Sequence, residues 1–182
     1  MQIIIISVAV LAAVLLAVYA FFGGFKKLEF VEEKQGGETL VYEELVGDYR
    51  QSAAGMDRVY YSLLNDHKLE TYKGFGIYYD NPQKVEKSKL RADAGCIVEE
   101  ADVHRIPVLK DPFRVKVLPE KEYLVTGFPY KGKMSVMVGI MKVYPAMSQY
   151  LKKKGYSGEG FVMEIYDTPG KKITYRKEII HK

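Results

Sequence analysis

Residues 74–82 read GFGIYYDNP, and residues 160–169 read GFVMEIYDTP. Each stretch begins with Gly-Phe, continues through an apolar and aromatic run and ends at Tyr-Asp-x-Pro. A second landmark, the Leu-Val at 40–41, has a counterpart at 124–125. The two Leu-Val pairs are 84 residues apart and the two Tyr-Asp pairs are 87 apart. This nearly constant offset predicts an internal repeat.

The residues around these landmarks predict the same order of elements in both copies. Apolar residues at helical spacing lie between the landmarks, and alternating runs of strand character lie on both sides of them. The expected strands cover residues 39–46 and 90–98 in the first copy and 122–126 and 173–179 in the second. Residues 74–81 and 160–168 are expected to form the corresponding strand and turn in the two halves. An extra strand is expected to open each copy, at 28–34 and at 113–118, and residues 99–112 join the copies. The predicted fold class is α+β, with duplicated strand–helix–strand–strand units that form a sheet with two main helical elements. Pro145 is expected to kink or split the second helix.

The start of the chain differs from the rest, because residues 3–22 carry no charge. A helix of that length spans about 30 Å, the thickness of the hydrocarbon core of a bilayer. We therefore expect a transmembrane anchor at 1–24 and a domain at 25–182, with repeat halves at about 26–100 and 112–182. Lys26 and Lys27 follow the segment and no basic side chain precedes it, which favours a cytosolic domain. A cleaved signal peptide ending near Val18-Tyr19-Ala20 is the alternative.

Charge and composition argue against several function classes. The 27 Lys and Arg exceed the 23 Asp and Glu by only four and are scattered, so direct nucleic-acid binding is not expected. Cys96 is the single cysteine, which rules out an internal disulfide and suggests a buried core thiol. His67, His104 and His181 are dispersed, without the spacing of a metal site. We predict no catalytic residue, no metal and no cofactor, and enzymatic activity is not expected.

Three further motifs carry a resemblance to a known family: Gly-Phe-Pro-Tyr at 127–130, Val-Tyr-Pro-Ala at 143–146 and Met-Glu-Ile-Tyr at 163–166. The doubled unit with these motifs resembles the GyrI-like small-molecule-binding domain, and most closely its membrane-anchored ER-phagy branch. The resemblance implies a single-pass protein of the endoplasmic reticulum that acts as a non-catalytic receptor or adaptor in reticulophagy. It also implies ubiquitin-like autophagy modifiers as partners, and a AAA unfoldase during repair of protein–DNA crosslinks.

A modifier-binding motif in that branch lies in a disordered tail, for which this chain has no counterpart up to Lys182. Tyr42-Glu43-Glu44-Leu45 has the required aromatic-x-x-aliphatic form with acidic neighbours. It also falls in a predicted strand, whose backbone would already be paired with neighbouring strands. Tyr42 and Leu45 are therefore a weak candidate for this contact.

Glu164 is the charge that stands out, because residues 162–166 are otherwise apolar or aromatic. A carboxylate ringed by tyrosines suits a small hydrophobic or cationic ligand. The pocket candidates are Glu164, Tyr166, Tyr49, Phe128 and Tyr130. The resemblance implies that this glutamate lines a pocket between the repeats, and that some members hydrolyse cyclopropanoid compounds. A small-molecule binder or detoxifying hydrolase, on the inner membrane if bacterial, is thus the alternative function.

Strand parity predicts which face Glu164 occupies. Phe161, Met163 and Ile165 form the more apolar set and are expected to meet the helices. Glu164 is then expected on the opposite face, in a cleft between the halves, because an unpaired buried carboxylate would cost several kcal/mol. A glutamate that faces water at a sheet edge, or that pairs with a lysine, is the alternative.

Overall fold

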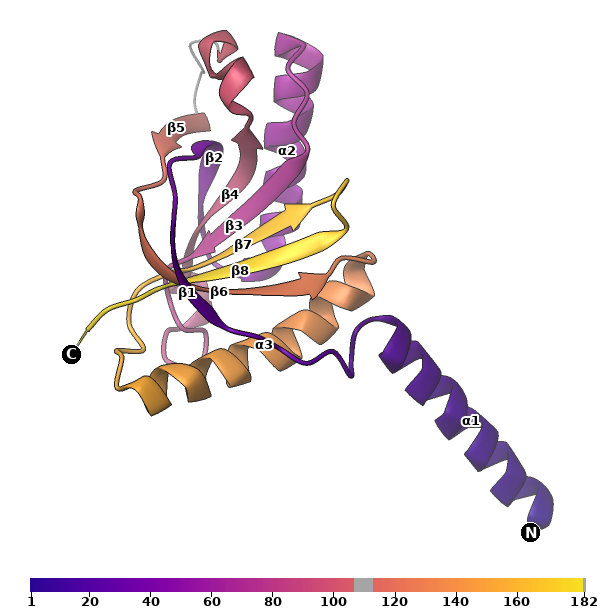
Figure 1. Cartoon of the computed structure of the whole chain (residues 1–182). Helices are drawn as coiled ribbons and strands as arrows, with labels where there is room; N and C mark the ends of the chain where they lie inside the picture. Colours follow the sequence, from indigo (N-terminus) through magenta and orange to yellow (C-terminus); the bar gives the residue numbers. More distant parts are fainter. Residues whose placement is uncertain (107–112, 182) are drawn as a thin grey trace.

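The computed structural model describes residues 1–106 and 113–181, and its main feature is an eight-stranded antiparallel sheet (Figure 1). The strand order is β1-β6-β8-β7-β3-β4-β2-β5. The strands are β1 Val31–Gln35, β2 Thr39–Val46, β3 Lys73–Tyr78, β4 Arg91–Val98, β5 Phe113–Val117, β6 Lys121–Pro129, β7 Val162–Asp167 and β8 Lys172–Glu178. The helices are α1 Gln2–Phe21, α2 Ser52–Tyr61 and α3 Lys133–Lys154, and a π turn, Ser62–Asp66, follows α2. Short 3₁₀ turns cover Tyr49–Gln51, Lys87–Lys89 and Glu100–Arg105. The rest of the expected joining segment, 107–112, lies outside the described residues.

The predicted α+β class with duplicated units is confirmed. The first unit is β2-α2-β3-β4 and the second is β6-α3-β7-β8. The units meet where β3 pairs with β7, which places Gly76 beside Glu164 and Phe75 beside Ile165. The two echoed stretches are therefore neighbours at the centre of one sheet.

The strands that open the two units are exchanged between them. β1 precedes β2 in the chain but pairs with β6, whereas β5 precedes β6 but pairs with β2. The connections after these strands are also bonded to each other. The Gly37 amide donates to the Leu118 carbonyl at 2.8 Å, and the Leu118 amide donates to the Glu38 carbonyl at 2.9 Å. This exchange ties the two repeats together at their edges as well as at the centre.

The second helix continues through Pro145 and is not split, since α3 is one helix of 22 residues. Val143, Met147 and Leu151 lie on its buried face on both sides of the proline, and their burial holds the two segments on the sheet. Gly155 ends the helix in the left-handed conformation, and Lys152, Lys153 and Lys154 place positive charge in its last turn.

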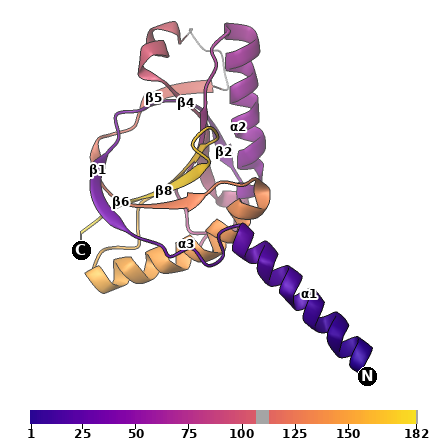
Figure 2. The ribbon, with the colours of Figure 1, turned by 45° about the vertical axis from the view of Figure 1, so that its right-hand side comes forward.

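The sheet has an apolar layer on each face. Its curl, visible in Figure 2, encloses an inner layer made of Leu40, Phe75, Ile77, Ile97, Leu118, Met163 and Ile165. The outer face carries both helices. Cys96 packs beneath α2, and Tyr166 and Ile173 pack beneath α3; all three lie in one row of the sheet through Gly74. Cys96 is a buried core thiol, as expected, and burial raises its pKa to about 11.

Helix α1 extends away from the domain, and none of its residues is buried (Figure 1). By length and composition it is able to cross a membrane. The last residue of α1 and the segment after it are held to the domain by two lysines. The Lys131 ammonium donates to the Phe21 carbonyl and the Lys142 ammonium donates to the Lys26 carbonyl, each at 2.8 Å.

Candidate functional site

Glu164 lies at the centre of the sheet, on β7. Its neighbours across the strands are Gly76 on β3 and Tyr175 on β8. The side chain is 1% exposed. Its Oε1 accepts a hydrogen bond from the Tyr144 hydroxyl at 2.6 Å, and its Oε2 accepts one from the Tyr166 hydroxyl. The carboxylate is thus buried and held by two hydroxyl donors.

The prediction that Glu164 faces away from the helices is wrong, because Tyr144 belongs to α3. Met163 and Ile165 instead face the inner layer of the curled sheet. Strand parity failed because it assumed one apolar face, whereas this sheet has two. Two hydroxyl donors offset part of the cost of burying the carboxylate beneath the helix.

Four tyrosines surround the carboxylate: Tyr78, Tyr144, Tyr166 and Tyr175. Two glycines provide the room for their hydroxyls. A Cβ at Gly76 would lie 2.6 Å from the Tyr78 hydroxyl, and one at Gly139 would lie 2.5 Å from that of Tyr175. The Tyr175 hydroxyl is buried and has no hydrogen-bond partner among the described residues. The site therefore keeps one unused donor and acceptor beside Glu164.

Burial dominates the electrostatics of this cluster. It raises the pKa of Glu164, and the hydrogen bonds from Tyr144 and Tyr166 oppose that rise. Burial and the negative charge of Glu164 together raise the pKa of both these tyrosines. The tyrosines thus remain protonated, as donors, across the physiological range.

Glu164 differs from the other buried carboxylates in one respect. Glu43 pairs with Arg58, and Asp93 pairs with Lys116. For Glu164, no salt bridge is formed within the described part of the chain. A buried carboxylate held only by neutral hydroxyls is stabilised by any cation that reaches it.

The predicted pocket residues lie at different distances from this centre. Tyr166 bonds Glu164 directly. Tyr130 packs on Tyr166 with 5.9 Å between the ring centroids, and Tyr49 packs on Tyr78 at 4.8 Å. Phe128 is fully buried in the core beneath α3, beside Gly139. Tyr49 and Tyr130 thus form an outer row around the four inner tyrosines.

Sequence reasoning missed Tyr78, Tyr144 and Tyr175. Tyr144 stands in the Val-Tyr-Pro-Ala motif, which was a usable signal. Tyr78 directly precedes the Tyr-Asp landmark at 79–80, which was interpreted as a turn and not as part of a site. Tyr175 reaches the site only through the register of β7 and β8, which the chain alone does not reveal.

The weak modifier motif, Tyr42 to Leu45, lies in β2. That strand pairs with β4 on one side and β5 on the other, and Leu45 is buried. A peptide can add a strand only at an unpaired edge. Where β2 pairs with both β4 and β5, it has no such edge.

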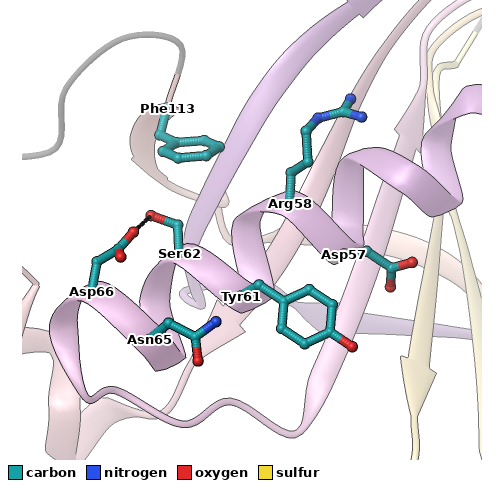
Figure 3. A pocket seen from close by; sticks show the side chains of 7 residues that line it. All are labelled: Asp57, Arg58, Tyr61, Ser62, Asn65, Asp66 and Phe113. Carbon is teal, nitrogen blue, oxygen red and sulfur yellow. Dashed lines mark hydrogen bonds between the residues drawn. The ribbon is translucent and has the colours of Figure 1, made fainter.

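Two hollows occur elsewhere on the domain. One, of about 500 Å³, lies beside α2, the π turn and β5, and Figure 3 shows the seven side chains that line it. They are Asp57, Arg58, Tyr61, Ser62, Asn65, Asp66 and Phe113. The other, of about 940 Å³, lies against the inner face of the sheet near Ile97, Ile165 and Arg176. Glu164 lines neither of these hollows, and its side chain is 1% exposed beneath the surrounding tyrosines.

Comparison with known proteins adds a family match. The model of the GyrI-like small-molecule-binding domain matches residues 32–180. Testis-expressed protein 264 from Homo sapiens is 32% identical over 88 residues, and its Mus musculus homologue is 30% identical over 88. These matches include 45% of this chain but only 28% of each relative.

Solved structures share the fold at low sequence identity. SAV2435 bound to tetraphenylphosphonium has a TM-score of 0.54 and 16% identity, covering 84% of this chain and 93% of that one. The C-terminal domain of EcmrR has a TM-score of 0.56 and 11% identity, covering 86% and 98%. EcmrR in its DNA complex has a TM-score of 0.63 and 9% identity, covering 98% and 69%. These likenesses establish the fold.

Proposed function

Because the chain belongs to the GyrI-like small-molecule-binding domain family, we propose that it binds a small hydrophobic cation at Glu164. One observation carries this proposal: Glu164 is a buried carboxylate that is bonded by two tyrosines and forms no salt bridge within the described residues. The ligand-bound relative supports the choice of cation, since SAV2435 was solved with tetraphenylphosphonium.

The chemistry of the surrounding rings fits such a ligand. The faces of tyrosine rings attract cations, and an attraction of about 2 kcal/mol or more is typical where water is excluded. Tyr78, Tyr144 and Tyr166 are partly exposed while Glu164 beneath them is not. We propose that these rings separate to admit the ligand, whose charge then lies near the carboxylate. The unpartnered Tyr175 hydroxyl is available for a polar group on the ligand.

We propose further that α1 anchors the domain to a membrane, with residues 1–24 as the anchor and 25–182 as the domain. The length and apolar composition of Gln2–Phe21 support this assignment. Lys26 and Lys27 follow the C-terminal end of α1 and favour a domain on the cytosolic side of the membrane. In a eukaryotic cell, this would be the cytosolic face of the endoplasmic reticulum.

The likeness to testis-expressed protein 264 supports a second candidate, a non-catalytic receptor or adaptor in ER-phagy. In this role the protein would act through ubiquitin-like autophagy modifiers, or through a AAA unfoldase in protein–DNA crosslink repair. Hydrolysis is the less favoured alternative, because the Glu164 side chain is 1% exposed and both its oxygens already accept hydrogen bonds from tyrosines.

A thermal-shift panel tests the ligand class. The full chain in detergent is melted with tetraphenylphosphonium and with an organic anion of similar size, tetraphenylborate. We expect the cation to raise the melting temperature of the native chain but not of Glu164→Gln. Glu32→Gln is the matched control, because Tyr150 and Tyr156 both donate to Glu32 at 3.0 Å near the surface. Stabilisation by the anion, or equal stabilisation of Glu164→Gln, would reject the proposal.

A further inference from the structure

The outer face of α3 carries large apolar side chains that the domain does not cover. Met134, Met137, Ile140 and Met141 are between 44% and 65% exposed. Their spacing places them along one side of the first half of the helix, and we call them the α3 stripe. Four large apolar side chains exposed together mark a contact surface rather than ordinary surface scatter.

Helix α3 lies next to the end of α1. Lys131, just before α3, bonds the last residue of α1, and Lys142, within α3, bonds the segment after it. In Figures 1 and 2, α3 lies between the sheet and the side from which α1 leaves, and its axis runs across that of α1. A bilayer crossed by α1 would therefore lie alongside α3.

We propose that the α3 stripe, with Phe21 and Phe25, rests in the interfacial layer of the bilayer that α1 crosses. This inference depends on the membrane anchor proposed above. Phe21 and Phe25 are 61% and 68% exposed and flank the point where the chain leaves α1. Amphipathic helices that lie in a membrane surface bury apolar side chains of this kind beneath the headgroups.

The charges around the α3 stripe favour lipid over a protein partner. Lys26 and Lys27, in the segment after α1, and Lys133, at the start of α3, are exposed. Lysine side chains at an interface direct their ammonium groups to anionic headgroups while their methylene stems stay in the apolar layer. The arrangement predicts that the domain is held against the membrane in one orientation.

Site-specific fluorescence on the full chain tests this contact. The chain is placed in nanodiscs of phosphatidylcholine and phosphatidylserine, and an environment-sensitive dye is attached to Met137→Cys. The buried Cys96 makes the native chain the control for background labelling. Asn65→Cys, exposed on the π turn after α2, is the control away from lipid, and Leu11→Cys reports on α1.

We expect the dye at residue 137 to emit at shorter wavelength than the dye at 65, and to be quenched by a quencher carried on lipid near the headgroups. An aqueous signal at 137 with a lipid signal at 11 would overturn the contact and leave the anchor intact. An aqueous signal at 11 would reject the anchor and the contact together. A shifted signal at 137 that lipid-borne quenchers do not reach would place the dye against protein instead of lipid and would also overturn the proposal.

A pair of charged variants provides the second test. Met137→Asp with Met141→Asp should return a dye at Ile140→Cys to the aqueous signal. Ser148→Asp, an exposed change beyond Pro145 on the same helix, should leave the Ile140→Cys signal unchanged. Because Met137 and Met141 are exposed, their replacement should leave the melting curve close to that of the native chain. Equal signals from the double variant and the Ser148→Asp control would contradict the proposal.

Discussion

Removal of the Tyr144 hydroxyl should destabilise the protein in a pH-dependent way. In Tyr144→Phe the Glu164 Oε1 loses a 2.6 Å hydrogen bond, while Oε2 keeps its bond from Tyr166. A hydrogen bond to a charged group contributes about 1.5–3 kcal/mol, and one between neutral groups about 0.5–1.5 kcal/mol. The loss should therefore be near the larger range when Glu164 is ionised and near the smaller range when it is protonated.

The assay is urea unfolding of the full chain in detergent, followed by circular dichroism of the sheet at several pH values. Tyr150→Phe is the matched control, because Tyr150 is also on α3 and donates to Glu32 at 3.0 Å. Glu32 lies nearer the surface and has Lys154 at 3.5 Å, so this loss should be smaller than that of Tyr144→Phe.

The two variants should differ both in their loss of stability and in its dependence on pH. Tyr144→Phe should cost more than Tyr150→Phe, and its excess should grow as the pH rises through the pKa of Glu164. An equal cost in both variants, or a Tyr144→Phe cost that does not change with pH, would refute the view that Tyr144 supports a buried ionised carboxylate.

Three other predictions follow from the same geometry. Because burial raises the folded-state pKa of Glu164 above its ordinary 4.5, the contribution of Glu164 to stability should be most favourable below pH 4.5 and should be lost as the pH rises through the folded pKa; Glu164→Gln should lack this component when its unfolding midpoints are subtracted from those of the native chain across pH. Gly139→Ala should press a methyl group against the Tyr175 hydroxyl and lower stability by about 1–3 kcal/mol in urea unfolding, whereas Gly158→Ala, with open space around it, should change stability by less than about 0.5 kcal/mol. Cys96 should resist a thiol reagent at pH 8 in the native chain and react in urea, since burial raises its pKa to about 11; rapid native labelling would contradict its place under α2.

The repeat and the fold class were predictable from the sequence because two landmarks recur at one offset. The helices followed from apolar spacing, and the central strands followed from the Gly-Phe to Tyr-Asp stretches. The pairing between strands that are distant in the chain could not be predicted from the sequence. The exchange of β1 and β5 depends on contacts between the halves, and no local pattern encodes it.

The sequence predicted the central residue of the candidate site but not most of the residues around it. Glu164 stood out as a charge in an apolar strand, and Tyr166 lies two residues away. The place of Tyr175 required the β7–β8 register, and the place of Tyr144 required the position of α3 over the sheet. The face of Glu164 was predicted wrongly because Met163 and Ile165 fill an inner layer that exists only once the sheet curls.

The most direct measurement is the position of a bound cation in the structure of the complex with tetraphenylphosphonium. Our account predicts that the cation lies beside Glu164, among the rings of Tyr78, Tyr144 and Tyr166, with the rings displaced from their unbound positions. A cation in the hollow beside α2 or against the inner face of the sheet, with the two hydrogen bonds to Glu164 unchanged, would contradict it.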